Sequence, residues 1–212
     1  MKKQTYLSVI TNFGCHWECP YCITKKTGIG IPQTSVHSLD KFEEAINEVK
    51  PTIISVSGGG DPLYDFSNHK DFYQKLYEIC DKKGLPIEMH TSLTDVDTGL
   101  CFCRVVYHLN FVSQIAKIKR RMNERVRVVF VVDDSFDKKK IDDIYEAVKE
   151  NGEIDELSYR QMVDSNYNPT TTCEDYLSAY HRRRWFYITQ GDYNTYYVEN
   201  ALHYNFKELR NK

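Results

Sequence analysis

Three cysteines are the residues of this chain best suited to chemistry. Cys15, Cys19 and Cys22 lie in the run C-H-W-E-C-P-Y-C, with the spacing C-x3-C-x2-C. A structural zinc site takes four protein ligands, and the nearest further candidate, His16, adjoins Cys15 too closely to share one ion with it. A [4Fe–4S] cluster takes one thiolate per iron, so three thiolates leave one iron open to a substrate or cofactor.

A second run with chemical character is S-G-G-G-D-P-L at residues 57–63. It follows the β-branched run T-I-I-S-V at 52–56, which is typical of a strand buried on both faces. Glycines let a ligand approach the backbone closely, and a proline fixes the turn. A glycine-rich turn without a ligand is the competing interpretation.

The cysteine spacing, with the aromatic Tyr21 directly before the last cysteine, resembles the signature of the radical S-adenosylmethionine (radical SAM) superfamily. The resemblance implies that Cys15, Cys19 and Cys22 hold a [4Fe–4S] cluster whose free iron chelates the amino and carboxylate groups of SAM. Reductive cleavage of SAM then gives a 5′-deoxyadenosyl radical, which abstracts hydrogen from a substrate. An external electron donor such as flavodoxin or ferredoxin is also implied, and Tyr21 is expected on the adenine side of SAM.

The glycine run resembles the Gly-Gly-Glu-Pro-like run of that family, whose backbone contacts the SAM amino group. The matching positions are Gly58, Gly59 and Gly60, followed by Asp61. This chain departs from the family by one extra glycine and by aspartate in place of glutamate.

Further SAM-binding positions are predicted at the ends of later strands. They are Thr91, Ser92, His108, Asn110 and Arg160. Arginine suits the SAM carboxylate because a guanidinium binds a carboxylate through two parallel hydrogen bonds. Structural hydrogen bonds in the mouth of a barrel are the alternative role for each residue.

The surrounding pattern predicts the scaffold. Six strand-like runs, at 6–10, 52–56, 86–90, 104–109, 126–132 and 157–163, alternate with helix-like segments that include 38–49, 69–83, 111–123 and 137–150. Repeated βα units predict an α/β fold with a parallel sheet, here a partial (β/α)6 TIM-like barrel; an open doubly wound sheet is the alternative. In both, active sites gather at the C-terminal ends of the strands, where the cysteine loop falls.

The chain is predicted to divide into a barrel at 1–165 and a C-terminal extension at 166–212 that packs on it. In the extension, 174–183 is expected to be a short helix, and 185–189 and 194–198 a hairpin around Q-G-D-Y. The basic run H-R-R-R-W at 181–185 is interpreted as a solvated helix face, with phosphate or nucleic-acid binding as the alternative.

Composition excludes several classes of protein. A net charge of −2 gives no global attraction to nucleic acid or anionic lipid. No apolar run approaches the length of about 18 residues that a membrane span needs, and no signal peptide is evident, so a cytoplasmic location is expected. The four cysteines outside the loop are interpreted as small buried hydrophobic residues.

The sequence thus favours a radical SAM enzyme acting on an unidentified small-molecule or protein substrate. The alternatives are a zinc-binding structural or interaction protein and a thiol redox protein built on Cys19 and Cys22. The short length resembles minimal family members, among them enzymes that make 7-carboxy-7-deazaguanine from a small pterin and activases that act on glycyl-radical proteins.

Overall fold

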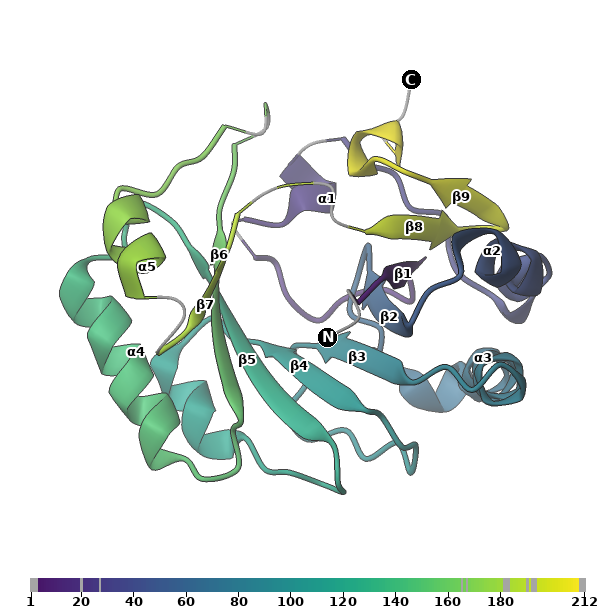
Figure 1. Ribbon diagram of the computed structural model, residues 1–212, viewed down its shortest axis with the longest axis horizontal. Helices are drawn as coiled ribbons and strands as arrows, with labels where there is room; N and C mark the ends of the chain where they lie inside the picture. The colour runs from purple at the N-terminus through teal and green to yellow at the C-terminus, as the bar shows by residue number, and fades with distance from the viewer. Residues whose placement is uncertain are drawn as a thin grey trace.

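The computed structural model describes residues 4–19, 21–26, 28–164, 166, 168–180, 184–189, 191 and 194–209. Within these ranges one nine-stranded sheet has the order β7-β6-β5-β4-β3-β2-β1-β8-β9. The first six strands are β1 (Tyr6–Thr11), β2 (Ile53–Gly58), β3 (Ile87–Thr91), β4 (Arg104–His108), β5 (Arg125–Val132) and β6 (Glu156–Gln161). They pair in chain order and all in parallel. The predicted partial barrel is confirmed: the sheet curves until β6 and β7 face β1 and β8 across the interior (Figure 1).

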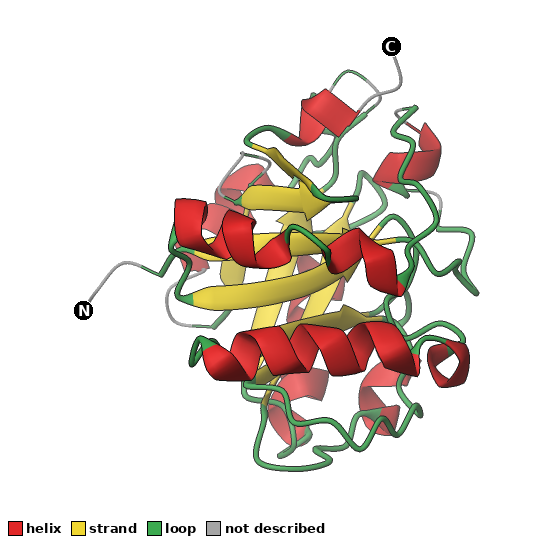
Figure 2. Cartoon of the chain, turned by 90° about the vertical axis from the view of Figure 1, so that its right-hand side faces the viewer, coloured by secondary structure: helices red, strands yellow, loops and turns green. Residues whose placement is uncertain are grey.

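Three amphipathic helices cover the outside of the sheet. These are α2 (Phe42–Val49), α3 (Lys70–Lys82) and α4 (Lys138–Glu150). Helix α4 buries Ile141, Ile144 and Val148, which lie on one face because they are three and four residues apart. Its first turn is capped by the carboxylate of Asp137, which accepts a hydrogen bond from the Lys140 amide at 2.7 Å. Figure 2, seen from the side of α2 and α3, shows the helices lying over the strands.

Shorter helices complete the described chain. They are α1 (Ile23–Lys26), α5 (Glu174–Tyr180) and the 3-10 helices η1 (Val36–Leu39), η2 (Phe66–Asn68), η3 (Val112–Lys117) and η4 (Phe206–Leu209). None of the helices in the described part of the chain combines the length and apolar character that crossing a membrane requires.

The hydrophobic core lies between the sheet and its outer helices. One cluster packs β1 to β3 against α2 and α3, with Leu7, Ile54 and Leu76 fully buried. A second packs β4 to β6 against α4 and α5, around Val128 and Trp185. Because strand residues alternate between faces, the neighbouring positions on each strand point into the barrel. Many of those positions are polar or charged, so the barrel interior is chemically distinct from the core.

The predicted helix at 111–123 is wrong, and only the 3-10 helix η3 forms there. In this segment, side-chain oxygens accept hydrogen bonds from several backbone N–H groups. The Gln114 amide oxygen accepts from the amides of Asn110 and Phe111 at 2.8 and 2.9 Å. Further on, the Glu124 carboxylate accepts from the amides of Arg121 and Met122 at 2.9 and 2.8 Å. These local bonds compete with helical ones and turn the chain.

The predicted hairpin at 185–189 and 194–198 is also wrong in its pairing. Strand β7 (Phe186–Ile188) joins β6 in parallel, and β8 (Thr195–Val198) joins β1 in parallel at the other side. The hairpin of the extension is instead β8 with β9 (Ala201–His203), around Glu199 and Asn200, whose φ angles of 43° and 64° suit a tight turn. The exposed edges of β1 and β6 offer unpaired backbone groups, and the extension satisfies them.

Candidate active site at the mouth of the barrel

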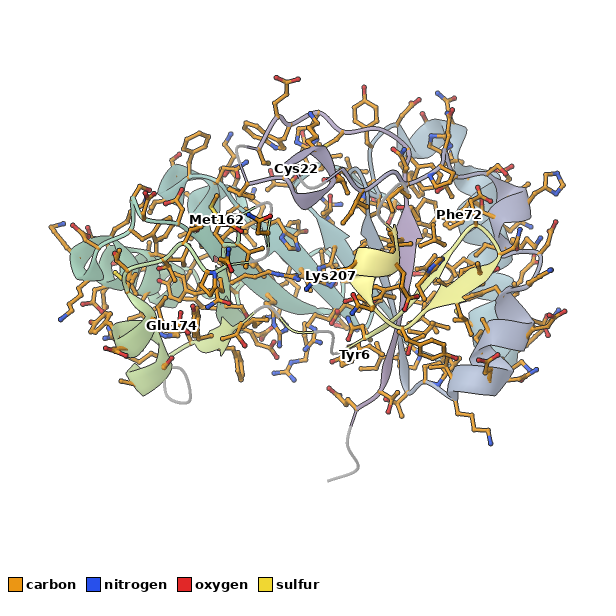
Figure 3. The ribbon with its side chains drawn as sticks, turned by 90° about the horizontal axis from the view of Figure 1, so that it is seen from above. Tyr6, Cys22, Phe72, Met162, Glu174 and Lys207 are labelled. Carbon is orange, nitrogen blue, oxygen red and sulfur yellow. The ribbon has the colours of Figure 1, made fainter. Side chains whose placement is uncertain are left out.

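The cysteine loop leaves the C-terminal end of β1 and is held in place by Asn12. The Asn12 side-chain amide donates to the carbonyl of Ile31 at 2.7 Å. The backbone amide of Asn12 donates to the Thr34 hydroxyl at 2.8 Å. Gly14 then adopts φ +95°, a conformation that favours glycine, and the chain turns towards Cys15. Seen from above, Cys22 lies between Phe72 and Met162, which mark opposite sides of the molecule (Figure 3).

Each of the three cysteine sulfurs has a hydrogen-bonding neighbour of its own. The Trp17 amide faces Cys15 Sγ at 3.5 Å, and the Asn110 side-chain amide faces Cys19 Sγ at 3.8 Å. The Thr24 hydroxyl lies 3.1 Å from Cys22 Sγ. Donors beside a sulfur stabilise the negative charge of a metal-bound thiolate, so this set of donors fits an iron–sulfur cluster.

The described residues do not form a single-ion metal site at the loop. Among the described residues, which include all three loop cysteines, no three side chains of the metal-ligating kinds converge on one ion position. Tetrahedral zinc needs its sulfurs about 2.3 Å from a shared centre, whereas a cluster gives each cysteine its own iron. The loop also buries the Trp17 indole nitrogen without a partner in the described chain, and that N–H is a donor open to a bound group.

Tyr21 and Asn110 come together beside Cys19. The Tyr21 hydroxyl donates to the Asn110 side-chain oxygen, and this contact joins the cysteine loop to the end of β4. Burial, and then the neighbouring Cys19 sulfur, raises the pKa of Tyr21, so the phenol stays protonated as a donor. A cavity of about 270 Å³ opens next to the pair, with Trp17 and Asp133 in its lining. Burial also raises the pKa of the Cys15 thiol, with the Trp17 amide opposing the shift.

The glycine run packs directly on the cysteine loop. A Cβ at Gly60 would lie 2.1 Å from the Gly14 carbonyl oxygen, and one at Gly59 would lie 2.6 Å from the Ile31 side chain. A Cβ at Gly58 would lie 2.7 Å from the Thr11 oxygen. The Gly59 amide donates to that same oxygen, at 2.7 Å. Close packing therefore accounts for the three glycines, against backbone atoms at Gly58 and Gly60 and against the Ile31 side chain at Gly59, and a side chain at any of them would displace its neighbour.

Asp61 joins the end of β2 to the end of β3. Its buried carboxylate accepts hydrogen bonds from the Thr91 hydroxyl at 2.8 Å and from the Ser92 amide and hydroxyl at 2.6 and 2.7 Å. A fourth bond comes from the Leu63 amide at 3.0 Å. The predicted residues Asp61, Thr91 and Ser92 are therefore brought together, and their polar groups satisfy one another.

The interior of the barrel holds a charged network that the sequence interpretation missed. At its floor, Glu156 pairs with Arg125 at 2.8 Å and with Arg104 at 3.4 Å, and it also pairs with Arg127. Arg104 pairs in turn with Glu88. Burial opposes ionisation of Glu88, but its bonds to His90 and Arg104 outweigh burial and lower the pKa of Glu88 to about 2. The signal was available as charged residues at alternate positions of otherwise apolar strands.

Above that floor, two of the predicted residues face the interior. His108 contacts His90, with 2.9 Å between His90 Nδ1 and His108 Nε2. Arg160 of β6 acts electrostatically on His108 from the far side, and burial lowers the pKa of Arg160. No carboxylate in the described part of the chain forms an ion pair with Arg160. An anionic ligand group would therefore find a free guanidinium there.

The remaining features lie away from the mouth. Residues 181–183 of the basic run fall outside the described residues, but Arg184 pairs with Asp142 at 2.9 Å and stacks on Tyr145 at 3.9 Å. A larger cavity, of about 710 Å³, lies over the outer face of β4 beside Val105 and Tyr107. Its position outside the barrel separates it from the cysteines, so cavity volume alone does not locate the site.

Residues 9–103 match the family model described as the Radical SAM superfamily. Crystal structures of Streptococcus suis SuiB are similar in fold, one bound to S-adenosylmethionine and one bound to the precursor peptide SuiA. Each is 13% identical and covers 89% of this chain, with TM-scores of 0.59 and 0.61. The chain covers 48% and 49% of the two SuiB chains, about half their length. No curated protein matched.

The matched region contains the cysteine loop, the glycine run, the C-terminal half of β1 and the whole of β2 and β3. The family implies a [4Fe–4S] cluster and SAM as cofactors. The sequence match to the radical SAM superfamily thus covers residues 9–103, and the SuiB structures show that the chain shares their fold.

Proposed function

We propose that this protein is an enzyme that cleaves SAM reductively and uses the resulting radical to abstract hydrogen from a substrate. When bound, a [4Fe–4S] cluster with one open iron supplies the electron transfer and SAM supplies the radical. The observation that carries the proposal is the mouth of the barrel itself. Three cysteines, each with its own donor, lie there on a loop that a glycine run holds against the strand ends.

In this proposal Cys15, Cys19 and Cys22 hold the cluster. The amide of Trp17, the side chain of Asn110 and the hydroxyl of Thr24 stabilise the charge on the three sulfurs. An external donor such as flavodoxin or ferredoxin supplies the electron. The exposed position of Cys15 supports such a route, because a cluster held by Cys15 would be accessible to a docked electron donor.

The SAM site is proposed along the strand ends. The backbone of Gly58 to Gly60 would contact the SAM amino group. Tyr21 would lie along the adenine side of SAM. Asp61 would act indirectly, by fixing Thr91 and Ser92 at the end of β3. Arg160 would bind the SAM carboxylate, since no described carboxylate neutralises it.

For the substrate we propose a small polar molecule, the class on which the enzymes that make 7-carboxy-7-deazaguanine act. The interior supports this class because it presents an unsatisfied hydrogen-bonding group to a ligand. The Ser158 hydroxyl is buried with no partner in the described part of the chain. A glycyl-radical protein, the substrate class of activases, is the alternative.

The test is anaerobic incubation of cluster-reconstituted protein with SAM and dithionite, followed by quantitation of 5′-deoxyadenosine and methionine. We expect both products in equal amounts. Cys19→Ala should abolish them, whereas the matched control Cys101→Ser changes an exposed cysteine outside the loop and should leave them unchanged. Colourless protein with stoichiometric zinc, or undiminished products from Cys19→Ala, would overturn the proposal.

A further inference from the structure

We propose that Glu88, His90 and His108 form a proton relay inside the barrel, and that His108 Nδ1 is the base that this relay presents to the substrate. The role in turnover rests on the proposed radical chemistry, whereas the hydrogen-bonding arrangement does not.

The three side chains form one continuous hydrogen-bonded chain. Glu88 Oε1 lies 2.8 Å from His90 Nε2, and His90 Nδ1 lies 2.9 Å from His108 Nε2. Strand register explains the contact. His90 of β3 is paired with Val106 of β4, so His108 lies two residues further along the neighbouring strand and on the same face.

The carboxylate end of this chain is firmly held. Glu88 lies in the interior with its carboxylate ion-paired to Arg104, and the Ser55 hydroxyl donates to its Oε1 at 3.3 Å. Arg104 is itself positioned by Glu156 and by the Tyr6 hydroxyl, at 3.4 and 3.0 Å. Glu88 therefore stays ionised and can only accept hydrogen bonds.

An ionised Glu88 fixes both imidazole tautomers. Because Glu88 only accepts, His90 Nε2 must carry the proton in that contact. In neutral His90 the other nitrogen, Nδ1, is then an acceptor. His108 Nε2 must donate to it, which leaves a lone pair on His108 Nδ1. No residue in the described part of the chain hydrogen-bonds with His108 Nδ1, so its lone pair is available to accept a proton.

Adding one proton reverses the direction of the hydrogen bond between His90 and His108. When His108 Nδ1 takes a proton, the Nε2 proton can pass to His90 Nδ1, and the positive charge comes to rest on His90 beside the Glu88 carboxylate. His108 Nδ1–H is then a donor. The relay thus has two states, a base and an acid, that differ by one proton. In the acid state the positive charge lies on His90, away from the reacting atoms of the substrate.

Burial and the surrounding charges favour the neutral form of His108. Burial has the largest effect in lowering the pKa of His108; His90 and Arg160 lower this pKa further, and Glu88 opposes them. The residue also lies close to the mouth, because Asn110, two positions further on, contacts Cys19. A neutral imidazole at this place can act on a substrate held beneath the cysteine loop.

The chemistry suits a substrate carbon that bears a hydroxyl or amino group. Once a hydrogen atom has left that carbon, the O–H or N–H bond beside the radical is far more acidic. His108 Nδ1 would take this proton while the bonding electron pair stays on the substrate oxygen or nitrogen. The substrate charge falls by one, the relay charge rises by one, and no further oxidant or reductant is consumed.

The test is nitrogen NMR of the full chain labelled with 15N-histidine, with His90→Gln and His108→Gln used for assignment. We expect Nε2-protonated tautomers at both residues in their neutral state. Glu88→Gln should lower the titration midpoint of His108 by about 1 to 3 pH units, because it removes the carboxylate whose charge favours the protonated form of His108.

A matched control is Glu208→Gln, which removes a carboxylate 3.6 Å from a different histidine, His203, and should leave the His108 midpoint unchanged. An Nδ1-protonated tautomer at His90 or His108 in the neutral state would overturn the relay, as would an unchanged midpoint in Glu88→Gln. The proposed enzyme activity is tested by a different measurement, because its failure would appear as the absence of 5′-deoxyadenosine and not as a change in the NMR spectra.

Discussion

Gly60 packs against the carbonyl oxygen of Gly14 so closely that a Cβ at position 60 would lie 2.1 Å from that atom. The next amide, that of Asp61, donates to the same oxygen at 2.9 Å. The loop after β2 and the loop after β1 are thereby fixed to each other by backbone atoms. The glycine run is therefore part of what positions the cysteines.

This relationship predicts the effect of Gly60→Ala. The added methyl group must push the Gly14 backbone away, and overpacking of this kind costs about 1 to 3 kcal/mol. Because Cys15 follows Gly14, the variant should bind less iron although no ligand is changed. Gly152→Ala is the control, since a Cβ there meets nothing within 4 Å. Iron and sulfide analysis of the two purified variants measures the effect; equal content in both would contradict it.

The three loop cysteines should be individually necessary for the cluster. Cys15→Ala, Cys19→Ala and Cys22→Ala each remove one thiolate, so each should lose most of its iron and its visible absorbance after reconstitution. Cys103→Ser, at an exposed position after the third strand, should keep both. Retention of a full cluster by any of the three alanine variants would exclude that cysteine as a ligand.

Asn110→Ala should weaken retention of the cluster without removing a ligand. The change deletes the amide that faces Cys19 Sγ at 3.8 Å and the acceptor of the Tyr21 hydroxyl. Loss of such supporting contacts costs about 10- to 100-fold in metal affinity. Competition with an iron chelator, followed by loss of visible absorbance, measures it. Asn151→Ala, which removes contacts to the carbonyls of Ile115 and Ile118, should lose stability but not cluster affinity.

Asp61→Asn tests the junction between β2 and β3. An amide offers only one acceptor oxygen, so its NH2 group would face either the amide and hydroxyl of Ser92 or the Thr91 hydroxyl and Leu63 amide. A buried donor left without an acceptor costs about 1 to 3 kcal/mol, which urea denaturation would detect. The exposed pair of Asp65 and Asn68 provides the comparison, because Asp65→Asn should change stability little. Equal stability of the two variants would show that the junction contributes nothing.

Glu88 should make folding stability depend on acid pH. Its pKa is lowered to about 2 in the folded protein, below the ordinary value of 4.5. Its contribution is therefore fully present above about pH 5 and is lost as the pH falls towards 2, because protonation breaks the contacts with Arg104 and His90. A shift of this size corresponds to a free energy on the order of 3 kcal/mol. Urea denaturation of wild type and Glu88→Gln between pH 2 and 6 measures the difference, which should shrink as the pH falls. A pH-independent difference would contradict this role.

Much of the fold was predictable because its signals are local. The β-branched run in Ile53–Gly58 and the three- and four-residue spacing of Ile141, Ile144 and Val148 each identify one element without reference to any other. The segment at 111–123 misled the prediction because the side chains of Gln114 and Glu124 compete for its backbone N–H groups. The spacing of hydrophobic residues along the sequence does not indicate whether side chains will compete for backbone N–H groups.

The sequence by itself determined the six parallel strands, the place of the cysteine loop after the first strand and the resemblance that the family match then confirmed. These follow from patterns a few residues long. Tertiary structure alone decided that β8 joins β1, that Gly60 meets Gly14, and that Glu88, His90 and His108 lie in one chain. Each of these depends on strand register and on the curvature of the sheet, which bring together residues whose separation along the chain carries no signal.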